Sequence, residues 1–539
     1  ENLAAMDVGI ASHNLFDLAY GLVLAHERGA LDKAQFEMLE GMANAQRRAL
    51  FELSRNLLLY APACRRENFI NAIGYLIRRL DEALGEGRVT TDPDRLAPLL
   101  HDERGRFVGK ARCLVQPRST AEVATTVRLC AEAGAPMVPQ GGNSGLCAGA
   151  TPFERGDEVL VSLTRMNRLR ALEPDNFTLT AEAGMTLQAV QQAAAQVDRL
   201  FPLSLGAEGT CQIGGNVSTN AGGIHVLRYG TMRDLVLGLE AVLPSGEVWD
   251  GLKSLRKDNT GYDLKHLFIG AEGTLGLITA AVLKLYSRPR SVATAWASVP
   301  TPEAAVTLLT RLREKIGGRV TAFELVGRPA LDLVLGNIPG SRDPLPLPSP
   351  WQVLIELSDT MAGDISAALE EVLAEAIVAR VAADAAIARN EKQARAFWAL
   401  RENISEAQKI EGVSIKHDIS LPVSRIPEFI ARGDATLASA FPGVRIVCFG
   451  HLGDGNLHYN QSKPRAQDNA AFIGQTEVVN RIVHDLVAEL GGSISAEHGL
   501  GQLKRDEVLR YKSEVEMDLM RKVKQALDPR GLMNPGKVL

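Results

Sequence analysis

Length, composition and charge place the chain among ordinary globular proteins. Its 539 residues are too many for one hydrophobic core, so we expect two or three domains. The net charge of −5, with 46% hydrophobic and 23% charged residues, excludes the strongly basic surface of a nucleic-acid-binding protein. No apolar run reaches the roughly 18 residues of a membrane span, so none is expected. The six cysteines form no C-x-x-C pair, which is typical of a reducing compartment.

Residues 1–84 are predicted to form a mostly helical appendage. Apolar residues recur at three- and four-residue spacing in Asn14–Glu27, Gln35–Tyr60 and Glu67–Leu84, and a short strand precedes them at Met6–Ser12. This spacing predicts three amphipathic helices.

Two motifs in this segment resemble the C-terminal part of a bacterial proline dehydrogenase barrel. They are Ala11-Ser-His-Asn14 and Tyr75-Leu-Ile-Arg78-Arg79-Leu-Asp-Glu82. In that family the paired arginines hold the proline carboxylate. A stretch of about 85 residues is far short of an eight-stranded barrel, so we interpret the segment as a non-catalytic appendage or as the trace of a fused or misjoined gene. Its apolar faces would dock on the body, self-associate or stay loosely folded.

Strands and helices alternate between residues 85 and 290. Strands are predicted at Cys113–Pro117, Met137–Pro139, Val159–Leu163 and Thr178–Ala183, helices at Ser119–Ala133 and Thr186–Ala195, and a hairpin at Leu235–Trp249. This rhythm is typical of a nucleotide-binding domain.

Three glycine clusters lie in the same region, at Pro139–Leu146, Gly206–Gly223 and Gly270–Thr279. Adjacent glycines let backbone N–H groups point into one concavity that suits a pyrophosphate. The clusters match neither G-x-G-x-x-G nor a Walker loop. Any one of them is also explained as a tight turn, but three together favour a dinucleotide site.

Together with Arg256-Lys-Asp-Asn-Thr-Gly-Tyr-Asp263, these clusters resemble the FAD-binding domain of the vanillyl-alcohol-oxidase/p-cresol-methylhydroxylase (PCMH) superfamily. The resemblance implies FAD with its pyrophosphate on Gly141–Gly145 and its ring against Gly206–Gly223. Relatives with covalent flavin carry a histidine in the first loop, where this chain has Asn143, so non-covalent FAD is expected. The residues expected to contact FAD are Pro139, Gly141, Gly142, Asn143, Ser144, Gly145, Leu146, Gly209, Thr210, Gly214, Gly215, Asn216, Ser218, Asn220, Gly222, Gly273, Gly276, Ile278 and Asn534.

Residues 291–500 are predicted to form a substrate or cap domain. Amphipathic helices are expected at Pro302–Ile316, Met361–Val381 and Asn390–Ile410, and strands at Arg319–Leu325, Gln352–Leu357 and Val413–Leu421. The fold class is therefore α+β: an FAD-binding domain of two subdomains (residues 85–290) and an antiparallel-sheet cap. Residues 501–539 are expected to return to the FAD domain.

A predicted hairpin in the cap brings two histidines together. The segment His451–Asn460 contains Asp454-Gly455, a strong signal for a two-residue turn. Such a turn pairs His451 with His458, with Cβ atoms about 5 Å apart, and Asn460 points the same way. The alternative is that the two histidines merely pack in a sheet.

A third imidazole and a carboxylate follow at Glu497-His498. His451, His458 and Glu497 suit a divalent metal site of the catalytic zinc type, which keeps one position open. A group that titrates near neutral pH beside such a site, here His498, suits a general base.

Three polar residues in the cap suit a carboxylate ligand. Arg401 and Ser405 are spaced i, i+4 in a predicted helix, and Lys416 lies in a predicted strand whose other face carries His417. Each residue alone is also explained as a solvated surface group, and His417 as a packed side chain.

The segment His451–Asn460, the pair Glu497-His498 and the tail Asn534-Pro-Gly-Lys537 narrow the resemblance to the FAD-linked D-2-hydroxyacid dehydrogenases, above all those acting on D-2-hydroxyglutarate. It implies hydride transfer to flavin N5, with a divalent metal, Zn²⁺ by preference, and His498 as the base.

The same resemblance assigns the substrate contacts. It puts Arg401, Ser405 and Lys416 on the distal carboxylate and Asn460 near the substrate. It also implies an electron-accepting protein such as electron-transfer flavoprotein, and a bacterial cytoplasm or a mitochondrial matrix as the location. A homodimer is left open. The alternatives are D-lactate or glycolate oxidation on the same scaffold, and a non-enzymatic flavin- or metal-binding module.

Overall fold

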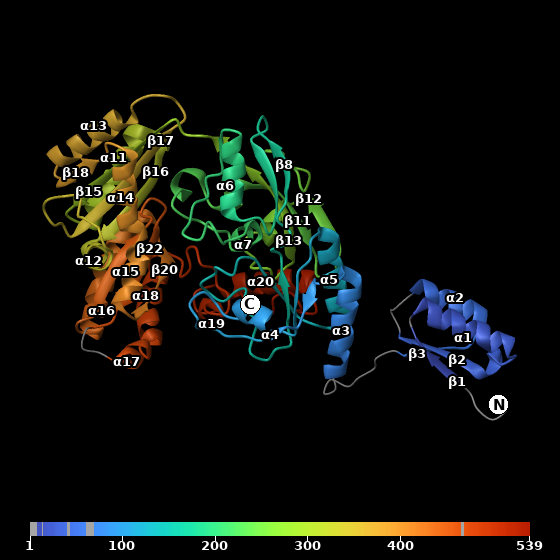
Figure 1. Cartoon of the computed structure of the whole chain (residues 1–539). Helices are drawn as coiled ribbons and strands as arrows, with labels where there is room; N and C mark the ends of the chain where they lie inside the picture. Colours follow the sequence, from blue (N-terminus) through green and yellow to red (C-terminus); the bar gives the residue numbers. More distant parts are fainter. Residues whose placement is uncertain (1–7, 13, 40–43, 61–68, 465–467) are drawn as a thin grey trace. The chain divides into compact units, whose positions relative to one another are not determined.

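The computed structural model describes residues 8–12, 14–39, 44–60, 69–464 and 468–539 (Figure 1). The chain divides into two compact units, residues 1–89 and residues 90–539. The start of the predicted strand at Met6 and of the predicted helix at Glu67 lie outside the described residues. Within the described part of the chain, no helix is long and apolar enough to cross a membrane.

The first unit is a three-stranded parallel sheet with helices between its strands. In chain order its elements are β1 (Val8–Ala11), α1 (Leu15–Glu27), η1 (Leu31–Lys33), β2 (Ala34–Leu39), α2 (Asn44–Ser54), β3 (Leu57–Tyr60) and α3 (Phe69–Leu84). The predicted helix over Gln35–Tyr60 is wrong, because β2 and β3 occupy its two ends. Phe36 and Met38 are buried and Gln35 and Glu37 are less so, which is the two-residue period of a strand.

The half of the second unit that the sequence predicts to bind FAD contains two larger sheets and a short two-stranded one, β10 (Arg199–Leu200) with β14 (Tyr286–Ser287). In the first, β5 (Cys113–Val115), β7 (Val159–Ser162) and β6 (Met137–Gln140) are parallel. The helix α5 (Thr120–Ala133) joins β5 to β6, and Ser119 caps its N-terminus by accepting from the N–H of Glu122. Both the strands and the capped helix were predicted.

The second sheet is antiparallel, in the order β12-β11-β13-β9-β8. Its strands are β8 (Leu169–Glu173), β9 (Thr178–Glu182), β11 (Val236–Val242), β12 (Val248–Gly251) and β13 (Leu277–Lys284). The helices α6 (Leu187–Gln196), α7 (Ile213–Ser218), α8 (Val226–Tyr229), α9 (Met232–Leu235) and α10 (Lys265–Phe268) lie among them in sequence. A single apolar core beneath this sheet includes Leu187, Ile213 and Leu239.

The cap half is built on an eight-stranded sheet in the order β18-β15-β17-β16-β21-β22-β19, with β20 also paired to β22. Its strands are β15 (Ser291–Val299), β16 (Val320–Gly327), β17 (Trp351–Asp359), β18 (Asp384–Ile387), β19 (Ser414–Ile415), β20 (Asp418–Ser420), β21 (Arg445–Gly450) and β22 (Asn456–Ser462). The expected strand Val413–Leu421 is thus two short strands.

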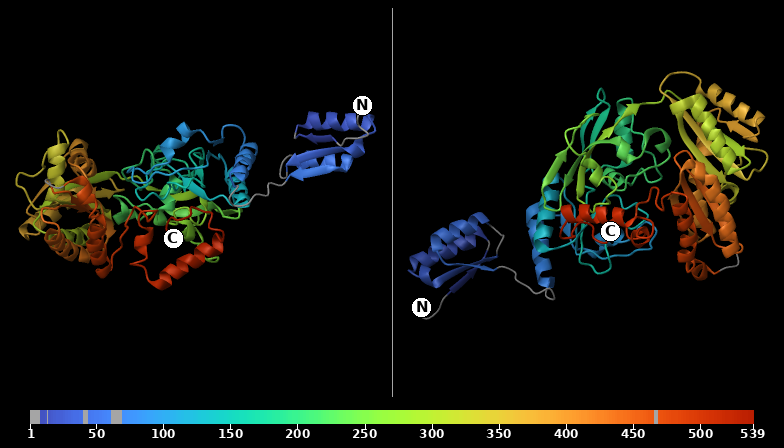
Figure 2. Two further views of the ribbon diagram at one scale, coloured as in Figure 1. Left: turned by 90° about the horizontal axis from the view of Figure 1, so that it is seen from below. Right: turned by 180° about the vertical axis from the view of Figure 1, so that it is seen from behind.

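Helices cover both faces of this sheet (Figures 1 and 2). On one face lie α11 (Pro302–Ile316), α13 (Ile365–Val378), α16 (Ile426–Ala440) and α18 (Thr476–Glu489). On the other lie α12 (Arg328–Asn337), α14 (Glu391–Glu402) and α15 (Ile404–Glu411). The predicted single helix Asn390–Ile410 is broken at Asn403, which separates α14 from α15.

The C-terminal segment packs on the FAD-binding half. After α19 (Arg505–Val508) and α20 (Glu514–Leu527), the N–H of Asn534 donates to the carbonyl of Met137 on β6. The Asn534 side chain donates to the carbonyls of Gly149 and Glu272 at 2.9 and 2.7 Å. The tail therefore joins the segment that follows the first glycine cluster to the third cluster.

Candidate active site

The loop between β21 and β22 is longer than the sequence suggested. Phe449, not His451, pairs with His458, so the predicted two-residue turn is wrong and residues 451–455 form the loop. Gly450 lies at φ 154°, and a Cβ there would approach the Asn456 carbonyl oxygen to 2.5 Å. Only glycine fits at this point, where the chain leaves the strand one residue early.

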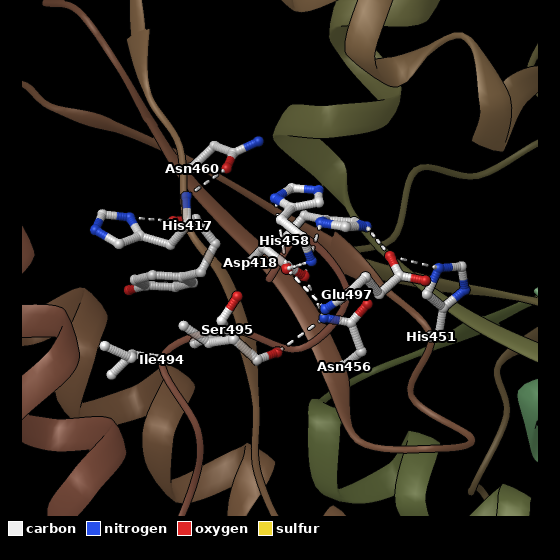
Figure 3. A network of polar contacts seen from close by, with 12 residues as sticks. His417, Asp418, His451, Asn456, His458, Asn460, Ile494, Ser495 and Glu497 are labelled. Carbon is white, nitrogen blue, oxygen red and sulfur yellow. Dashed lines mark hydrogen bonds and ion pairs between the residues drawn. The ribbon is translucent and has the colours of Figure 1, made fainter. Parts of the chain in front are cut away.

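The two histidines nevertheless converge (Figure 3). The ring centroids of His451 and His458 are 5.8 Å apart. Glu497, in the irregular segment after α18, places Oε2 3.8 Å from Nε2 of His451 and 4.0 Å from Nε2 of His458. One donor atom from each of the three residues lies within 4.8 Å of the others.

The donor set of this cluster fits a divalent ion. Two imidazoles and one carboxylate leave a coordination position for a ligand oxygen, as catalytic zinc sites do. Burial holds the pKa of His458 far below its usual range, so that ring is neutral and able to ligate. Burial, with Asp418 and Asp454 nearby, raises the pKa of Glu497 to about 7, and a cation would reverse that rise.

Glu324 on β16 orients His451 from behind. Its Oε1 lies 2.7 Å from Nδ1 of His451, and its Oε2 accepts from Nε of Arg401 at 2.7 Å. Burial raises the pKa of Glu324, but the charges of His451 and Arg401 outweigh burial and hold it at about 2. The contact at Nδ1 leaves Nε2 of His451 facing Glu497, as a second carboxylate commonly fixes a metal-binding histidine.

Asp418 on β20 holds the Glu497-His498 turn. Its Oδ2 accepts from the backbone N–H groups of both residues at 2.9 Å, and its Oδ1 accepts from Nδ2 of Asn456 at 2.9 Å. Figure 3 shows this carboxylate between the turn and β22. The turn is therefore fixed to the cap sheet through one buried carboxylate.

His498 stands in the wall of the main cavity. Its Nδ1 lies 3.4 Å from Oδ2 of Asp418. Burial, and then the nearby cations, lower the pKa of His498 to about 4 in spite of Asp418. A neutral imidazole with Nδ1 toward a carboxylate presents Nε2 as a proton acceptor.

A cavity of about 540 Å³ lies between the glycine clusters and this turn. Gln140, Gln212 and Asn216 line it, and each has a buried side-chain oxygen without a hydrogen-bond partner in the described structure. Buried polar atoms without partners point to a polar ligand that supplies them. A Cβ on Gly142 would approach the Thr210 carbonyl oxygen to 1.9 Å, so this wall admits backbone only. The lining fits a dinucleotide.

Comparisons with known proteins show which family the chain belongs to. The family models that match are "FAD binding domain" over residues 111–251, "FAD linked oxidases, C-terminal domain" over residues 288–538 and "Proline dehydrogenase" over residues 1–87. The mitochondrial D-2-hydroxyglutarate dehydrogenase of Bos taurus is 39% identical over 459 residues, or 85% of this chain and 82% of that one. The bacterial D-2-hydroxyglutarate dehydrogenase of Xanthomonas citri pv. viticola is 36% identical over 468 residues, or 86% and 96% of the two chains. The chain belongs to the D-2-hydroxyglutarate dehydrogenase family.

Solved structures agree on the fold. p-Cresol methylhydroxylase with bound substrate superposes with a TM-score of 0.68 at 15% identity, covering 88% of this chain and 97% of that one. Alkyldihydroxyacetonephosphate synthase gives 0.66 at 16% identity, covering 89% and 87%. This D-2-hydroxyglutarate dehydrogenase family member is an FAD-linked oxidoreductase with the expected PCMH-type fold, and FAD is its cofactor.

Most residues that the sequence proposed for FAD line the cavity in this family member. Gly209, Asn220 and Asn534 do not. Asn220 accepts from the N–H of Arg233, and Asn534 connects backbone segments as described above. Sequence reasoning missed Gln140 and Gln212, although they lie within the first and second glycine clusters.

Sequence reasoning also missed three carboxylates of this family member. Asp418 and Glu324 hold the turn and His451, and Glu272 lines the cavity while accepting from the N–H groups of Leu500 and Gly501 at 2.7 and 2.9 Å. All three lie far along the chain from the residues they hold. Within the third glycine cluster, Glu272 was the one acidic side chain and could have been noticed.

The four proposed substrate residues are placed differently from one another. Arg401 is buried against Glu324, and Ser405 is exposed on α15 beyond the break at Asn403. Asn460 shares a strand face with His458, but its amide is used by the N–H of His417 and by Gln408. Like Lys416, none of the three lines the 540 Å³ cavity.

Lys416 is half-buried near His498, and no hydrogen bond or ion pair of its ammonium occurs among the described residues. Burial, and then the charges of Arg104 and Lys409, lower its pKa to about 8. His417, the next residue along the chain, packs in the core as expected. Its Nδ1 lies 3.1 Å from the Tyr459 carbonyl oxygen, and burial lowers its pKa to about 3.

Proposed function

We propose that the protein oxidises D-2-hydroxyglutarate to 2-oxoglutarate, using FAD and a divalent metal, Zn²⁺ by preference. The observation that carries the proposal is the cluster of His451, His458 and Glu497, with neutral His498 beside it in the wall of the cavity that fits FAD. Both relatives compared above carry the name of this activity.

The chain's own residues divide the chemistry between them. FAD supplies a hydride acceptor at N5, and a divalent ion supplies Lewis acidity that makes the 2-hydroxyl group more acidic. Nε2 of His498 takes the hydroxyl proton while C2 loses its hydride, which leaves a 2-oxo acid. Asp418 keeps Nδ1 of that ring occupied, so the proton goes to Nε2.

A dicarboxylate is the substrate class that the cations favour. Lys416 offers a half-buried ammonium without a partner among the described residues. Arg401 offers a guanidinium beside His451, although Glu324 already pairs with it. Because Glu324 already neutralises Arg401, fewer cations remain for a distal carboxylate. This observation supports the alternative substrates, D-lactate and glycolate, which have no distal carboxylate.

Anaerobic reduction of the bound flavin tests the proposal. D-2-hydroxyglutarate, D-lactate, D-malate and glycolate are compared by flavin bleaching, with and without chelator. We expect the fastest bleaching with D-2-hydroxyglutarate and its loss on chelation. Fast bleaching by a metal-free protein would show that the reaction needs no metal. Absence of bleaching by any of these acids would favour a non-enzymatic flavin-binding module.

His498→Ala tests the base. Removing the proton acceptor is expected to slow flavin reduction by at least about a hundredfold while FAD stays bound. His417→Ala, which removes a buried imidazole away from the cavity, is the matched control. Equal reduction rates for His498→Ala and the native protein would refute the assignment.

The path of the electrons after reduction is part of the proposal. We propose an electron-accepting protein such as electron-transfer flavoprotein, and a bacterial cytoplasm or a mitochondrial matrix as the location. The Bos taurus relative is named as mitochondrial.

A further inference from the structure

We propose that Arg104, on the FAD-binding half, is a specificity-determining residue that binds the distal carboxylate of the substrate together with Lys416 of the cap. The inference rests on the proposed function and deepens it, because it explains how the site would select a dicarboxylate. Arg104 lies outside the glycine clusters and outside the cap, so no sequence motif drew attention to it.

The loop that carries Arg104 is rigidly built. Asp102 is 2% exposed, and its carboxylate accepts from the N–H groups of Arg104, Arg106 and Phe107 at 3.3, 2.7 and 2.8 Å. The N–H of Asp102 donates to the Phe107 carbonyl, which closes the loop. A loop held through one carboxylate presents its side chains in a fixed direction.

This loop adjoins the FAD cavity. Nδ2 of Asn143, in the first glycine cluster, donates to the His101 carbonyl at 2.8 Å. Glu103, the neighbour of Arg104, lines the same cavity as His498. The loop is therefore tied to the wall in which the proposed base stands.

Arg104 and Lys416 are two half-buried cations with no counter-ion. Neither side chain makes a hydrogen bond or ion pair with any other described residue. The buried carboxylates that act on Arg104 are already engaged: Asp102 accepts from three backbone N–H groups of its own loop, and Asp418 from two backbone N–H groups and from Asn456. A half-buried charge without a partner costs free energy that a bound anion would recover.

The charges around this pair favour an anion. Lys409 and Arg106 add positive charge near Lys416, while Glu406 opposes it, and Glu103 stands in the cavity wall beside Arg104. Burial lowers the pKa of Arg104, as does repulsion by Arg106. A guanidinium fork can bind a carboxylate through two parallel hydrogen bonds, and an ammonium adds a point charge. The combination suits one carboxylate between the two halves of the unit.

The chemistry predicts which substrates depend on Arg104. A D-2-hydroxy acid with a distal carboxylate, such as D-2-hydroxyglutarate, would contact it, and D-lactate, which ends in a methyl group, would not. Removal of Arg104 should therefore weaken binding of the first acid and leave the second unchanged. A role in holding the loop alone would affect both substrates alike.

The experiment compares Arg104→Gln with the native holoenzyme. We expect KM for D-2-hydroxyglutarate to rise at least tenfold, with kcat and all D-lactate parameters within twofold. Arg104→Lys keeps the charge without the fork and should recover part of the loss. Arg106→Gln, on the same loop and exposed, is the matched control and should change KM by less than threefold.

A binding measurement supplies a readout without turnover. Glutarate and butyrate are compared as non-reactive ligands by their effect on the melting temperature of the holoenzyme. Glutarate should stabilise the native protein and Arg106→Gln, and should lose most of that effect with Arg104→Gln, whereas butyrate should act weakly on all three.

The outcomes separate the two proposals. An unchanged KM for D-2-hydroxyglutarate in Arg104→Gln, or an equal rise for both acids, overturns the role of Arg104. If no D-2-hydroxy acid reduces the flavin of the native protein, the proposed function fails, and the glutarate measurement still decides whether Arg104 binds a dicarboxylate. If Arg104→Gln loses FAD, the variant Arg104→Lys decides instead. An unchanged KM and unchanged stabilisation by glutarate in Arg104→Lys overturn the proposal. A rise in KM for D-2-hydroxyglutarate alone, smaller than that expected for Arg104→Gln, supports it.

Discussion

Glu324 is a carboxylate whose two oxygens are both in use, one toward the guanidinium of Arg401 and the other toward the imidazole of His451. All three side chains are buried. At the scale of single residues, such a group stabilises the fold and also fixes a ligand, because the contact that neutralises the charge also sets the direction of the ring.

Glu324→Gln is expected to weaken both roles. It leaves Arg401 and His451 buried without a counter-charge, which should cost about 3 kcal/mol or more of unfolding free energy at pH 7. Because the pKa of Glu324 lies at about 2, below the ordinary 4.5, the native carboxylate stabilises the protein above pH 4.5 and loses that effect as the pH falls toward 2. Chemical denaturation of the native protein and the variant at several pH values measures the difference.

The control for this prediction is Glu356→Gln on the next strand. Glu356 accepts from Nε1 of Trp398 on α14 at 2.8 Å, so it holds the helix that carries Arg401 without contacting the cluster of His451, His458 and Glu497. Only Glu324→Gln should also lower the affinity of the proposed metal site for a divalent ion. Equal loss of stability in the two variants would contradict the role given to the buried pair.

If Lys416 binds the distal carboxylate as proposed, substrate binding depends on pH. Since its pKa is lowered by burial to about 8, the ammonium is charged at pH 7 and loses its proton as the pH rises through 8. We expect kcat/KM for D-2-hydroxyglutarate, divided by that for D-lactate, to fall above about pH 8. Lys416→Arg keeps its charge and should abolish the fall. A ratio that stays flat in the native protein would refute the prediction.

At the scale of elements, the turn that carries Glu497 and His498 has no regular secondary structure, and two carboxylates hold it in place. Asp418 of the cap accepts the N–H groups of residues 497 and 498, and Glu272 of the FAD-binding half accepts those of residues 500 and 501. The turn is thus fixed at both ends by acceptors from different sheets.

Asp418→Asn should disturb the turn without unfolding the cap. The amide keeps one acceptor oxygen but places an NH₂ group against donors that need an acceptor. We expect flavin reduction to slow by roughly ten- to a hundredfold with FAD still bound. Loss of a residue that orients a metal-binding side chain typically has an effect of this size. Stopped-flow reduction by D-2-hydroxyglutarate measures it.

Asp434→Asn is the matched control. Asp434 is a carboxyl group that accepts from the Tyr459 hydroxyl at 2.5 Å in the cap core, away from the cavity lining. Its loss should lower stability but leave the reduction rate within twofold. A slow rate in both variants would mean that the cap, not the turn, was disturbed.

Element prediction from the sequence succeeded where a local signal exists. The capped helix α5 and the amphipathic helix α11 have such signals, and both were predicted. The break at Asn403 and the early exit from β21 at Gly450 were missed, because tertiary packing decides them. The three histidines and Glu497 were proposed from local patterns, whereas Glu324 and Asp418 each occur in an apolar or mixed strand with no motif around them.

At the scale of the whole molecule, the first unit has its own small core. That core includes Leu18, Phe36 and Leu50, with Ile10 and Leu57 packed against it. Its strands at 34–39 and 57–60 were missed because a short apolar run can be read at a helical or a strand period.

Deleting residues 1–60 tests how far the second unit depends on that core. Since every residue of this core lies before residue 60, we expect FAD content and the flavin reduction rate to stay within twofold. Phe36→Asp, which disrupts the same core at full length, should give the same result. Loss of FAD in both variants would show that the second unit needs the first.

Glu272 belongs to the lining of the dinucleotide cavity and also to the support of the segment that carries Glu497. A group shared in this way couples two equilibria: filling one site changes the affinity of the other, and thermodynamic reciprocity makes the factor identical in both directions. If the proposed site holds a divalent ion, protein without flavin should therefore bind that ion less tightly, and protein without the ion should release flavin more readily.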